Sequence, residues 1–463
     1  MNFLIVLAAL LLLMFVAYRG FSVILFAPIA AMLAVLLTDP SAVPTVFTSL
    51  FMEKMVVFVK LYFPVFLLGA VFGKIIEMSG FARSIVTAVI GVVGKQRAIL
   101  SIVLVCAILT YGGVSLFVVV FAAYPFAAEM FRQSAIPKRL IPGTIALGAF
   151  SFTMDSLPGT PQIQNIIPTT FFDTTTWAAP ILGVVGAIFI LASGLAWLEW
   201  RRNQAAAAGE GYGINHINEP EPMVDEKLVA PAIAILPLVS VFVANRVLTS
   251  VIPAVYGAKH AVQLAGMAAP ITADVASVTA IWAVMGALLL GILMVFAFAF
   301  RPVIAKFAEG SKAAVSGALL ASLNTASEYG FGAVIAALPG FLTIRDALSQ
   351  IPNPLVNEAI TVTTLAGITG SASGGLSIAL AAMSKQFIAA AEAAHIPLEV
   401  LHRVAAMASG GMDTLPHNGA VITVLAVTGL THEVSYADIF AVTVLKTVAV
   451  FVVIGFYYAT GLY

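Results

Sequence analysis

The sequence predicts an all-α polytopic membrane protein. It predicts an inverted repeat of two five-span halves, each with a re-entrant hairpin and a broken transmembrane helix. Three observations lead to this prediction: the composition, a set of motifs that occurs twice, and the placement of the basic residues. The 463 residues are 61% hydrophobic and only 10% charged, with a mean hydropathy of +1.05. Several apolar runs exceed the roughly 18 residues that indicate a membrane span.

Apolar segments follow one another along the whole chain. They cover residues 2–18, 22–37, 55–78, 98–127, 140–170, 177–198, 229–250, 276–300, 313–338, 360–390, 398–428 and 438–461. The first of them lacks a basic leader and a small-residue cleavage site, so we expect it to be a retained span.

One clearly hydrophilic stretch, residues 199–228, divides the chain. It is rich in alanine, glycine, proline and acidic residues, which is typical of a solvated linker. We therefore expect an N-terminal repeat at 1–198, a cytoplasmic linker at 199–228 and a C-terminal inverted repeat at 229–463.

Matching motifs in the two halves indicate an internal duplication. GFA at 80–82 corresponds to GFL at 340–342, GGVS at 112–115 to GGLS at 374–377, IP at 136–137 to IP at 396–397, and MDSLP at 154–158 to MDTLP at 412–416. The four pairs occur in the same order at nearly constant spacing, which chance does not readily produce.

The basic residues predict how the halves are oriented. If 98–127 forms a re-entrant hairpin with its tip at Gly112–Gly113, the lysines and arginines on both sides of it share one face of the membrane; a single span would separate them. The positive-inside rule favours hairpins at 98–127 and 360–390. Each half then crosses five times, and because five is odd the second half is inverted. The outer side is expected to hold Lys54, Arg246, Lys259, Arg345, Lys385 and Arg403.

Two polar stretches interrupt apolar segments. SFTMDSLPGTPQIQN (151–165) lies within 140–170, and SGGMDTLPHNG (409–419) lies within 398–428. Their prolines and glycines should break each span into half-helices. Non-helical chain at membrane depth must be buried in protein or line a wet cavity. The two breaks and the hairpin tips TYGGVS and GSASGGLS are therefore predicted to converge on one polar site. Close helix packing and simple kinks are the alternative for any one stretch.

Three acids and one histidine are the candidates for proton coupling. Asp155 and Asp413 occur at equivalent positions of the two breaks, where each could carry a proton, bind sodium or cap a half-helix. Glu328 lies in SLNTASEYGFG (322–332) and could also mark the end of a span. His417 could titrate near neutral pH or be a hydrogen-bonded structural residue.

Small and polar residues at the tips and breaks are the candidates for substrate binding. They are Gly112, Gly113, Ser115, Ser156, Gly159, Thr160, Gln162, Asn165, Asn324, Thr325, Ser371, Ser373, Gly374, Gly375, Thr414, His417 and Asn418. The amides could instead join helices. We expect no fixed cation at this site, so backbone N–H groups, hydroxyls and amides should bind an anion. The sequence suggests no role for Lys446, which lies in an apolar run.

Several classes of protein are disfavoured by what the sequence lacks. The formal net charge is zero, so nucleic acid is not an expected partner. Cys106 is the single cysteine and is interpreted as a small buried hydrophobic residue. No Walker loop, metal-binding cluster or cofactor motif occurs. We expect neither an enzyme nor an ATP-driven pump, and no cofactor or metal.

Longer stretches resemble a known family. GGVSLFVVVFAAYPFAAEMFR (112–132), IPKRLIPGTIALGAFSFTM (136–154), PGTPQIQNIIPT (158–169) and GGMDTLPHNGAVI (410–422) are similar to the gluconate:proton symporters of the ion-transporter superfamily. The resemblance covers essentially the whole chain, and PGTPQIQN is its most specific part.

The resemblance implies proton-coupled symport of a small hydroxylated monocarboxylate across the bacterial inner membrane. The substrate would be a gluconate-like sugar acid or a short hydroxy acid such as 3-hydroxybutyrate, and the paired MD(S/T)LP acids favour the latter. A homodimer with an elevator-like movement is also implied. The alternatives are a sodium-coupled dicarboxylate or citrate carrier of the same superfamily, against which the lack of fixed positive charge counts, and a channel or membrane-embedded enzyme.

Overall fold

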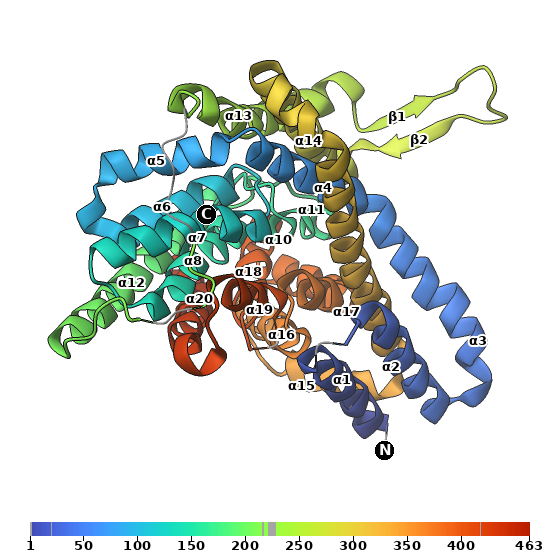
Figure 1. Cartoon of the computed structure of the whole chain (residues 1–463). Coiled ribbons are helices and arrows are strands. Elements are labelled where there is room, and N and C mark those ends of the chain that lie inside the picture. The colour runs from blue at the N-terminus through green and yellow to red at the C-terminus, as the bar shows by residue number, and fades with distance from the viewer. Residues whose placement is uncertain (1, 20, 215–216, 221–227, 417) are drawn as a thin grey trace.

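The computed structural model describes residues 2–19, 21–214, 217–220, 228–416 and 418–463, and it shows a protein built from packed α-helices (Figure 1). Within these ranges, six helical segments are long and apolar enough to cross a membrane. They are Pro40–Met78, Pro180–Ala207, Pro231–Tyr256, Val275–Ala337, Ala372–Ala393 and His432–Thr460. The predicted all-α polytopic membrane architecture is confirmed.

The first half of the chain mixes long helices with short ones. Its helices are α1 (Asn2–Tyr18), α2 (Val23–Thr38), α3 (Val43–Val46), α4 (Met52–Met78), α5 (Phe81–Val93), α6 (Ala98–Tyr111), α7 (Leu116–Gln133), α8 (Ile141–Ala149), α9 (Phe152–Asp155), α10 (Ile163–Ile166), α11 (Thr169–Phe172) and α12 (Pro180–Ala207). A π-helical turn, Phe47–Phe51, joins α3 to α4 without a loop.

The second half contains the longest helix and a small sheet. Its elements are α13 (Pro231–Tyr256), β1 (Lys259–Val262), β2 (Ile271–Asp274), α14 (Val275–Ala337), α15 (Pro339–Ser349), α16 (Pro354–Thr369), α17 (Ala372–Ala393), α18 (Leu398–Ser409), α19 (Gly419–Thr428) and α20 (His432–Thr460). The antiparallel strands β1 and β2 pair Lys259 with Asp274 and project from the helices in Figure 1. The sequence did not indicate this hairpin.

Two helix pairs occupy the segments expected to form hairpins. α6 and α7 pack on each other, as do α16 and α17. The chain turns between α6 and α7 at Gly113, whose φ of 95° favours glycine. It turns between α16 and α17 at Gly370, with φ 65°, and the Ser371 hydroxyl then caps α17 by accepting from the Gly374 N–H at 3.0 Å.

The segments 140–170 and 398–428 are both interrupted. α8 ends at Ala149, and only the single turns α9, α10 and α11 follow before α12. α18 ends at Ser409, and regular helix resumes at α19 with Asn418 as its N-cap. The prolines and glycines of MDSLPGTP and MDTLP explain why the helices stop there, because proline cannot continue an α-helical hydrogen-bond ladder.

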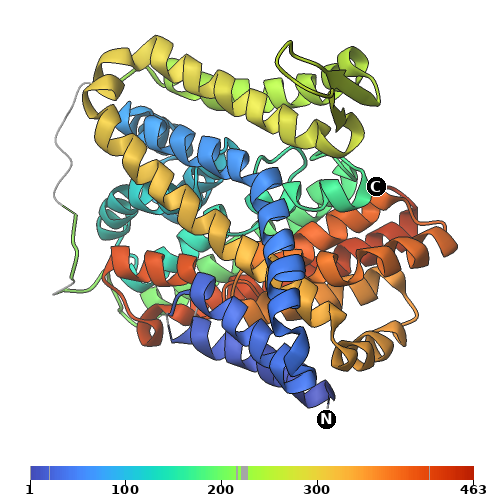
Figure 2. The ribbon, with the colours of Figure 1, turned by 90° about the vertical axis from the view of Figure 1, so that its right-hand side faces the viewer.

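α14 contains both of the apolar segments predicted at 276–300 and 313–338. Its 63 residues form two helices that meet at a kink at Ala299 (φ −136°, ψ 38°) without an intervening loop. Pro302 follows three residues later, and its ring removes one backbone donor and crowds the preceding turn, which kinks the helix. Figure 2 shows the two arms of α14 meeting at a bend. The charged residues between the predicted spans continue the helix instead of forming a loop.

The linker is shorter than the predicted 199–228. α12 continues to Ala207 because the alanines there are strong helix formers. Beyond it, the Asn218 carbonyl accepts from the Tyr124 hydroxyl at 2.7 Å, and the Asn218 amide donates to the Ala426 carbonyl at 2.9 Å. Arg139 donates to Glu210 at 2.7 Å, and this bond lowers the pKa of Glu210. The linker is thus fastened to both halves.

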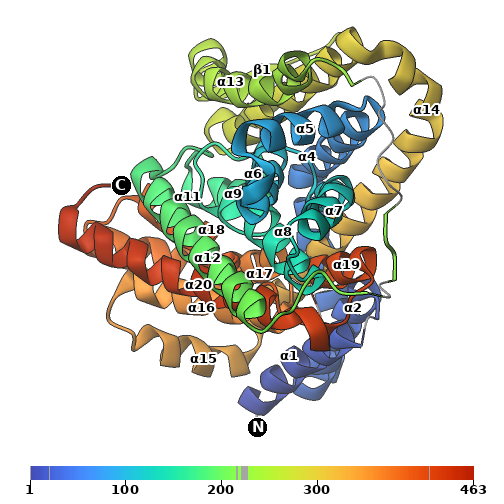
Figure 3. The same ribbon diagram turned by 60° about the vertical axis from the view of Figure 1, so that its left-hand side comes forward.

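Contacts between the halves are reciprocal. α1 packs on α15 while α13 packs on α5, α4 lies along α14, and α12 lies along α20 (Figure 3). These are the contacts that two intertwined copies of one repeat would make. The short helices α5 and α15 fall outside the predicted spans, since neither is long enough to cross a membrane alone.

Close helix packing in the core gives the first testable prediction. A Cβ added at Gly148 on α8 would lie 2.5 Å from Val103 O and Cys106 Cβ of α6. We expect Gly148→Ala to destabilise the protein by about 1–3 kcal/mol through overpacking, measured as a lower thermal-unfolding midpoint in detergent. Gly91→Ala on α5 is the control, because a Cβ there meets nothing within 4 Å. Equal midpoints for the two variants would contradict the α6–α8 packing.

Candidate functional site

A cavity of about 800 Å³ lies between the hairpin tips, the two helix breaks and α14. It brings together many of the residues that the sequence singled out. Its lining includes Gly113, Ser115, Gln162, Asn324, Thr325, Glu328, Ser371, Ser373, Asp413, Thr414 and Asn418. Residues far apart in the chain, from both halves, therefore share one space.

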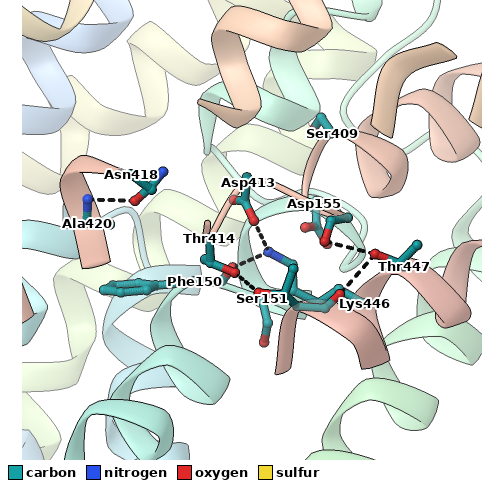
Figure 4. Close-up of polar contacts among 12 residues, drawn as sticks. Phe150, Ser151, Asp155, Ser409, Asp413, Thr414, Asn418, Ala420, Lys446 and Thr447 are labelled. Atoms are coloured by element: carbon teal, nitrogen blue, oxygen red, sulfur yellow. Dashed lines mark hydrogen bonds and ion pairs between the residues drawn. The ribbon is translucent and has the colours of Figure 1, made fainter. Parts of the chain in front are cut away.

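The N-termini of three helices line this cavity. Leu116 begins α7, Ala372 begins α17 and Gly419 begins α19, and all three are lining residues. Helix N-termini carry partial positive charge and free N–H groups that favour anions. At α17 and α19, side chains already cap part of these groups; Asn418 Oδ1 accepts from Ala420 N at 2.7 Å (Figure 4). Ser115 makes no such bond at α7.

One wall of the cavity runs along α14. It consists of small residues that lead to a polar end formed by Asn324, Thr325 and Glu328. From Ala313 to Glu328 the wall extends about 22 Å at 1.5 Å per helical residue. Lys74 and Glu77, ion-paired at 2.9 Å and partly exposed, also line the cavity. We take the end near this pair as the mouth.

Much of the remaining lining is apolar. It includes Val65, Phe66, Leu116, Met154, Ile163 and Leu288. A site with mostly apolar walls and a few convergent polar groups binds molecules that have both an alkyl body and a polar end.

Glu328 lies at the polar end and is 3% exposed. Its Oε2 has no hydrogen-bond partner among the described residues. A Cβ on Gly374 would overlap this carboxyl group, so the glycine lets the first turn of α17 approach Glu328. Beside them, the Thr325 and Ser373 hydroxyls lie 3.1 Å apart.

Asp413 forms a buried ion pair with Lys446 of α20. Lys446 Nζ donates to Asp413 Oδ1 at 2.8 Å and to the Phe150 carbonyl at 2.7 Å (Figure 4). Lys446 is 1% exposed. Asp155 also lies close to Lys446 at Gly410: a methyl group on Gly410 would overlap Asp155 Oδ2 and lie 3.0 Å from Lys446 Nζ. Asp155 and Asp413, the two acids of the repeated motif, therefore both lie close to Lys446.

Arg403 of α18 is a second buried cation and holds the first break in place. It is 0% exposed. Its Nη1 donates to the Asp155 carbonyl at 2.9 Å and to Asn165 Oδ1 at 3.0 Å, and its Nη2 donates to the Ala178 carbonyl at 2.8 Å. His402 Nε2 also lies 3.1 Å from Asn165 Oδ1. These bonds pair backbone groups that a break in a helix leaves free.

Some predicted site residues lie behind the cavity wall. Gly112 packs on Leu238 and Gly375 on the backbone of Ala366. Gly159, with φ 78°, packs on Trp177. The remaining members of this set are engaged in hydrogen bonds: Ser156 donates to Asp155 Oδ1, Thr160 donates to the Thr153 carbonyl, and Asn165 donates to the Thr160 and Thr176 carbonyls.

Asp155 and Gly374 are likewise absent from the lining, although Gly374 lies against the Glu328 carboxyl group, as described above. His417 lies outside the described residues.

Two expectations about positive charge were wrong. Arg403 was expected among the basic residues on the outer side of the membrane, yet its side chain is fully buried and bonds the first break. No fixed cation was expected near the site, yet Lys446 pairs with Asp413. A lysine in an apolar run is costly unless it is paired, so its position could have indicated an acid partner. In the described ranges, no group of three or more His, Cys, Asp or Glu side chains could hold a metal ion.

Comparison with known proteins agrees with a transporter. Over 471 residues, the chain is 58% identical to the "Uncharacterized transporter YxjC" of Bacillus subtilis (strain 168), and the match covers 100% of both sequences. The crystal structure of the Alcanivorax borkumensis YdaH transporter matches with a TM-score of 0.48 and 13% identity, covering 91% of this chain and 90% of that one. No family model matches the chain.

The fold and the site thus define a multi-pass membrane transporter and not an enzyme. Within that class, the chain belongs to the family of the Bacillus subtilis transporter YxjC.

The hydrogen bonds of Arg403 give the second testable prediction. Arg403→Met would leave the carbonyls of Asp155 and Ala178 unpaired, and each buried unpaired acceptor costs about 1–3 kcal/mol. We expect a clearly lower thermal-unfolding midpoint in detergent. Lys385→Met, at an exposed lysine of α17, should leave the midpoint unchanged. A wild-type midpoint for Arg403→Met would show that the first break does not depend on this side chain.

Proposed function

We propose that the protein is a secondary active transporter that carries a small hydroxylated monocarboxylate by proton symport. The observation that carries the proposal is the convergence of helix N-termini and buried acids on one cavity formed by both halves. Broken helices meeting near the middle of a membrane are the usual way in which secondary transporters bind a charged substrate and its coupling ion.

The character of the cavity supports a short hydroxy acid. A carboxylate can accept hydrogen bonds from N–H groups at the start of α7, while hydroxyls and amides such as Ser373 and Asn324 can bind a substrate hydroxyl. The apolar walls suit a short alkyl body better than the many hydroxyls of a sugar acid. A di- or tricarboxylate would require more positive charge than the lining residues provide.

In this proposal the coupling ion is a proton, and the Asp155–Asp413 centre is a better place for it than Glu328. A coupling acid must be ionised for part of the cycle, and Asp413 can be, because Lys446 compensates it. Glu328 has no ion-pair partner among the described residues, so an ionised Glu328 would be an isolated buried charge. We therefore place the coupled proton at the Asp155–Asp413 centre and regard Glu328 as a protonated hydrogen-bond donor.

The transport cycle would alternate the access to this cavity. The mouth near Lys74 and Glu77 lies on the side that the positive-inside rule assigns to the cytoplasm, so the described conformation is inward-open in this proposal. The bacterial inner membrane, a homodimer and an elevator-like movement complete the proposal, as the sequence resemblance implies.

The function is tested by uptake into proteoliposomes. We expect hydroxy acids of three to six carbons, with (R)-3-hydroxybutyrate preferred to D-gluconate, to accumulate when the outer side is more acidic. The control liposomes contain no protein. Uptake that needs sodium and ignores pH would favour the sodium-coupled alternative, and uncoupled flux that follows voltage alone would favour a channel.

The role of Glu328 gives a further prediction. Glu328→Gln keeps a neutral hydrogen-bonding group, so we expect uptake driven by the pH gradient to stay within about threefold of wild type. Glu328→Leu cannot form hydrogen bonds, so we expect it to lose most of the uptake. Glu392→Gln, an exposed acid of α17, is the control. If Glu328→Gln abolished accumulation but kept substrate exchange, the coupled proton would belong to Glu328.

A further inference from the structure

The deep part of the cavity has no basic side chain on its surface. Lys74 is the one lysine or arginine in the described lining, and it lies at the mouth, already paired with Glu77. A carboxylate bound at the polar end would therefore be compensated by helix N-termini alone, which contribute only partial charges. Burying an anion with so little compensation is costly.

Lys446 lies directly behind this surface. Its two hydrogen-bond acceptors, Asp413 Oδ1 and the Phe150 carbonyl, both belong to residues that line the cavity. The side chain of Asp413 is 10% exposed, whereas that of Lys446 is 1% exposed. One carboxylate therefore separates the ammonium group from the cavity.

The charges around Lys446 balance. Asp155 and Asp413 contribute two formal negative charges, and Lys446 and Arg403 contribute two positive ones. Arg403 is held by the Asp155 and Ala178 carbonyls and by the Asn165 amide oxygen, so it is not free to turn toward a substrate. Lys446 is the cation whose partner, Asp413, can be neutralised by a proton.

Other titratable groups lie on the elements packed against α20, which are α12, α16, α18, α8, α19 and the turn at 138–140. Besides the residues already discussed, these groups and those of α20 itself are Lys138, Arg139, Glu199, Arg201, Arg202, Glu358, Glu399, His402, His432, Glu433, Tyr436, Asp438, Tyr457 and Tyr458. Asp438 is engaged with Arg201 at 2.8 Å, and Tyr436 donates to the Thr414 carbonyl. Glu358 is fully buried with neither carboxyl oxygen partnered among the described residues, so it is treated as neutral.

We propose that Lys446 is the cation that binds the substrate carboxylate, and that its ion pair with Asp413 prevents this binding until a proton binds to Asp413. The inference rests on the proposed function. A proton on Asp413 weakens the ion pair, and the ammonium group then exchanges its carboxylate partner for that of the substrate. When proton and substrate leave, the Lys446–Asp413 pair forms again.

This exchange determines the ratio of proton to substrate. The empty site has a formal charge of zero, a bound proton adds one positive charge, and a bound monocarboxylate adds one negative charge. The empty and the loaded transporter are then equally uncharged at this centre. One proton accompanies each monocarboxylate, and transport does not respond to the membrane potential.

Wild-type transport in proteoliposomes measures both consequences. The probe is (R)-3-hydroxybutyrate, the potential is set with potassium and valinomycin, and proton entry is followed with an internal pH dye. We expect one proton per substrate and an initial rate that is the same at either sign of the potential. A ratio of two or more, or a rate that follows the potential, would overturn the exchange mechanism.

Asp413→Asn separates the exchange mechanism from a purely structural ion pair. The amide oxygen can still accept from Lys446, so folding should be retained, but the lysine no longer faces a carboxylate. We expect substrate affinity to lose its pH dependence and uptake to become uncoupled and driven by an inside-positive potential. Proton-coupled, voltage-independent uptake in this variant would refute the proposal.

The double variant Asp413→Asn with Lys446→Met removes the cation without leaving a buried charge unpaired. We expect the KM for (R)-3-hydroxybutyrate to rise at least about tenfold, as loss of a buried charge partner does. The protein should still fold, with a thermal-unfolding midpoint lowered only by the loss of the bond to the Phe150 carbonyl. Lys60→Met, at an exposed lysine of α4, is the control and keeps the wild-type KM. An unchanged KM in the double variant would refute the proposal but not the transport function, whereas a wild-type protein that carries no hydroxy acid would refute both.

Discussion

Breaking a helix inside a membrane leaves backbone groups that lipid cannot pair, and the organisation of this protein depends on how those groups are satisfied. At the first break the carbonyls of Asp155 and Ala178 accept from Arg403, which belongs to the second half. At the end of α8 the Phe150 carbonyl accepts from Lys446, also from the second half. The bonds that make the breaks tolerable therefore also hold the two halves together around the cavity.

The same bonds give the site its electrostatic character. Lys446 and Arg403 are fixed by oxygens of the broken segments, and each acid of the repeated motif lies near a cation. The cavity surface consequently presents helix N-termini, hydroxyls and the Asp413 carboxylate, with Lys446 one layer behind it. Such an arrangement makes protonation of Asp413 the event that changes the local charge.

Much of the fold could be predicted because hydropathy and helix-breaking residues act locally. The apolar runs, the glycines at 112–113 and the prolines of the two MD(S/T)LP motifs indicated where helices cross, turn and stop. The helical structure of residues 301–312 in α14 was missed because charged residues at a bend look like a loop in sequence. The pairing of Lys446 with Asp413 and the burial of Arg403 were missed because they depend on which helices pack side by side. For the same reason the sequence could not separate lining residues such as Gln162 from buried ones such as Asn165.

The two breaks are alike in their acids but not in their cations. α8 corresponds to α18 in the repeat and contains no basic residue, and α12, which corresponds to α20, has arginines only near its C-terminal end. An ancestor made of two identical unfused chains could not have had this distribution, because each break would have carried the same residues. The charge balance of the present site must therefore postdate the divergence of the two copies from each other. Since then neither half could be exchanged for a second copy of the other without leaving buried charge uncompensated.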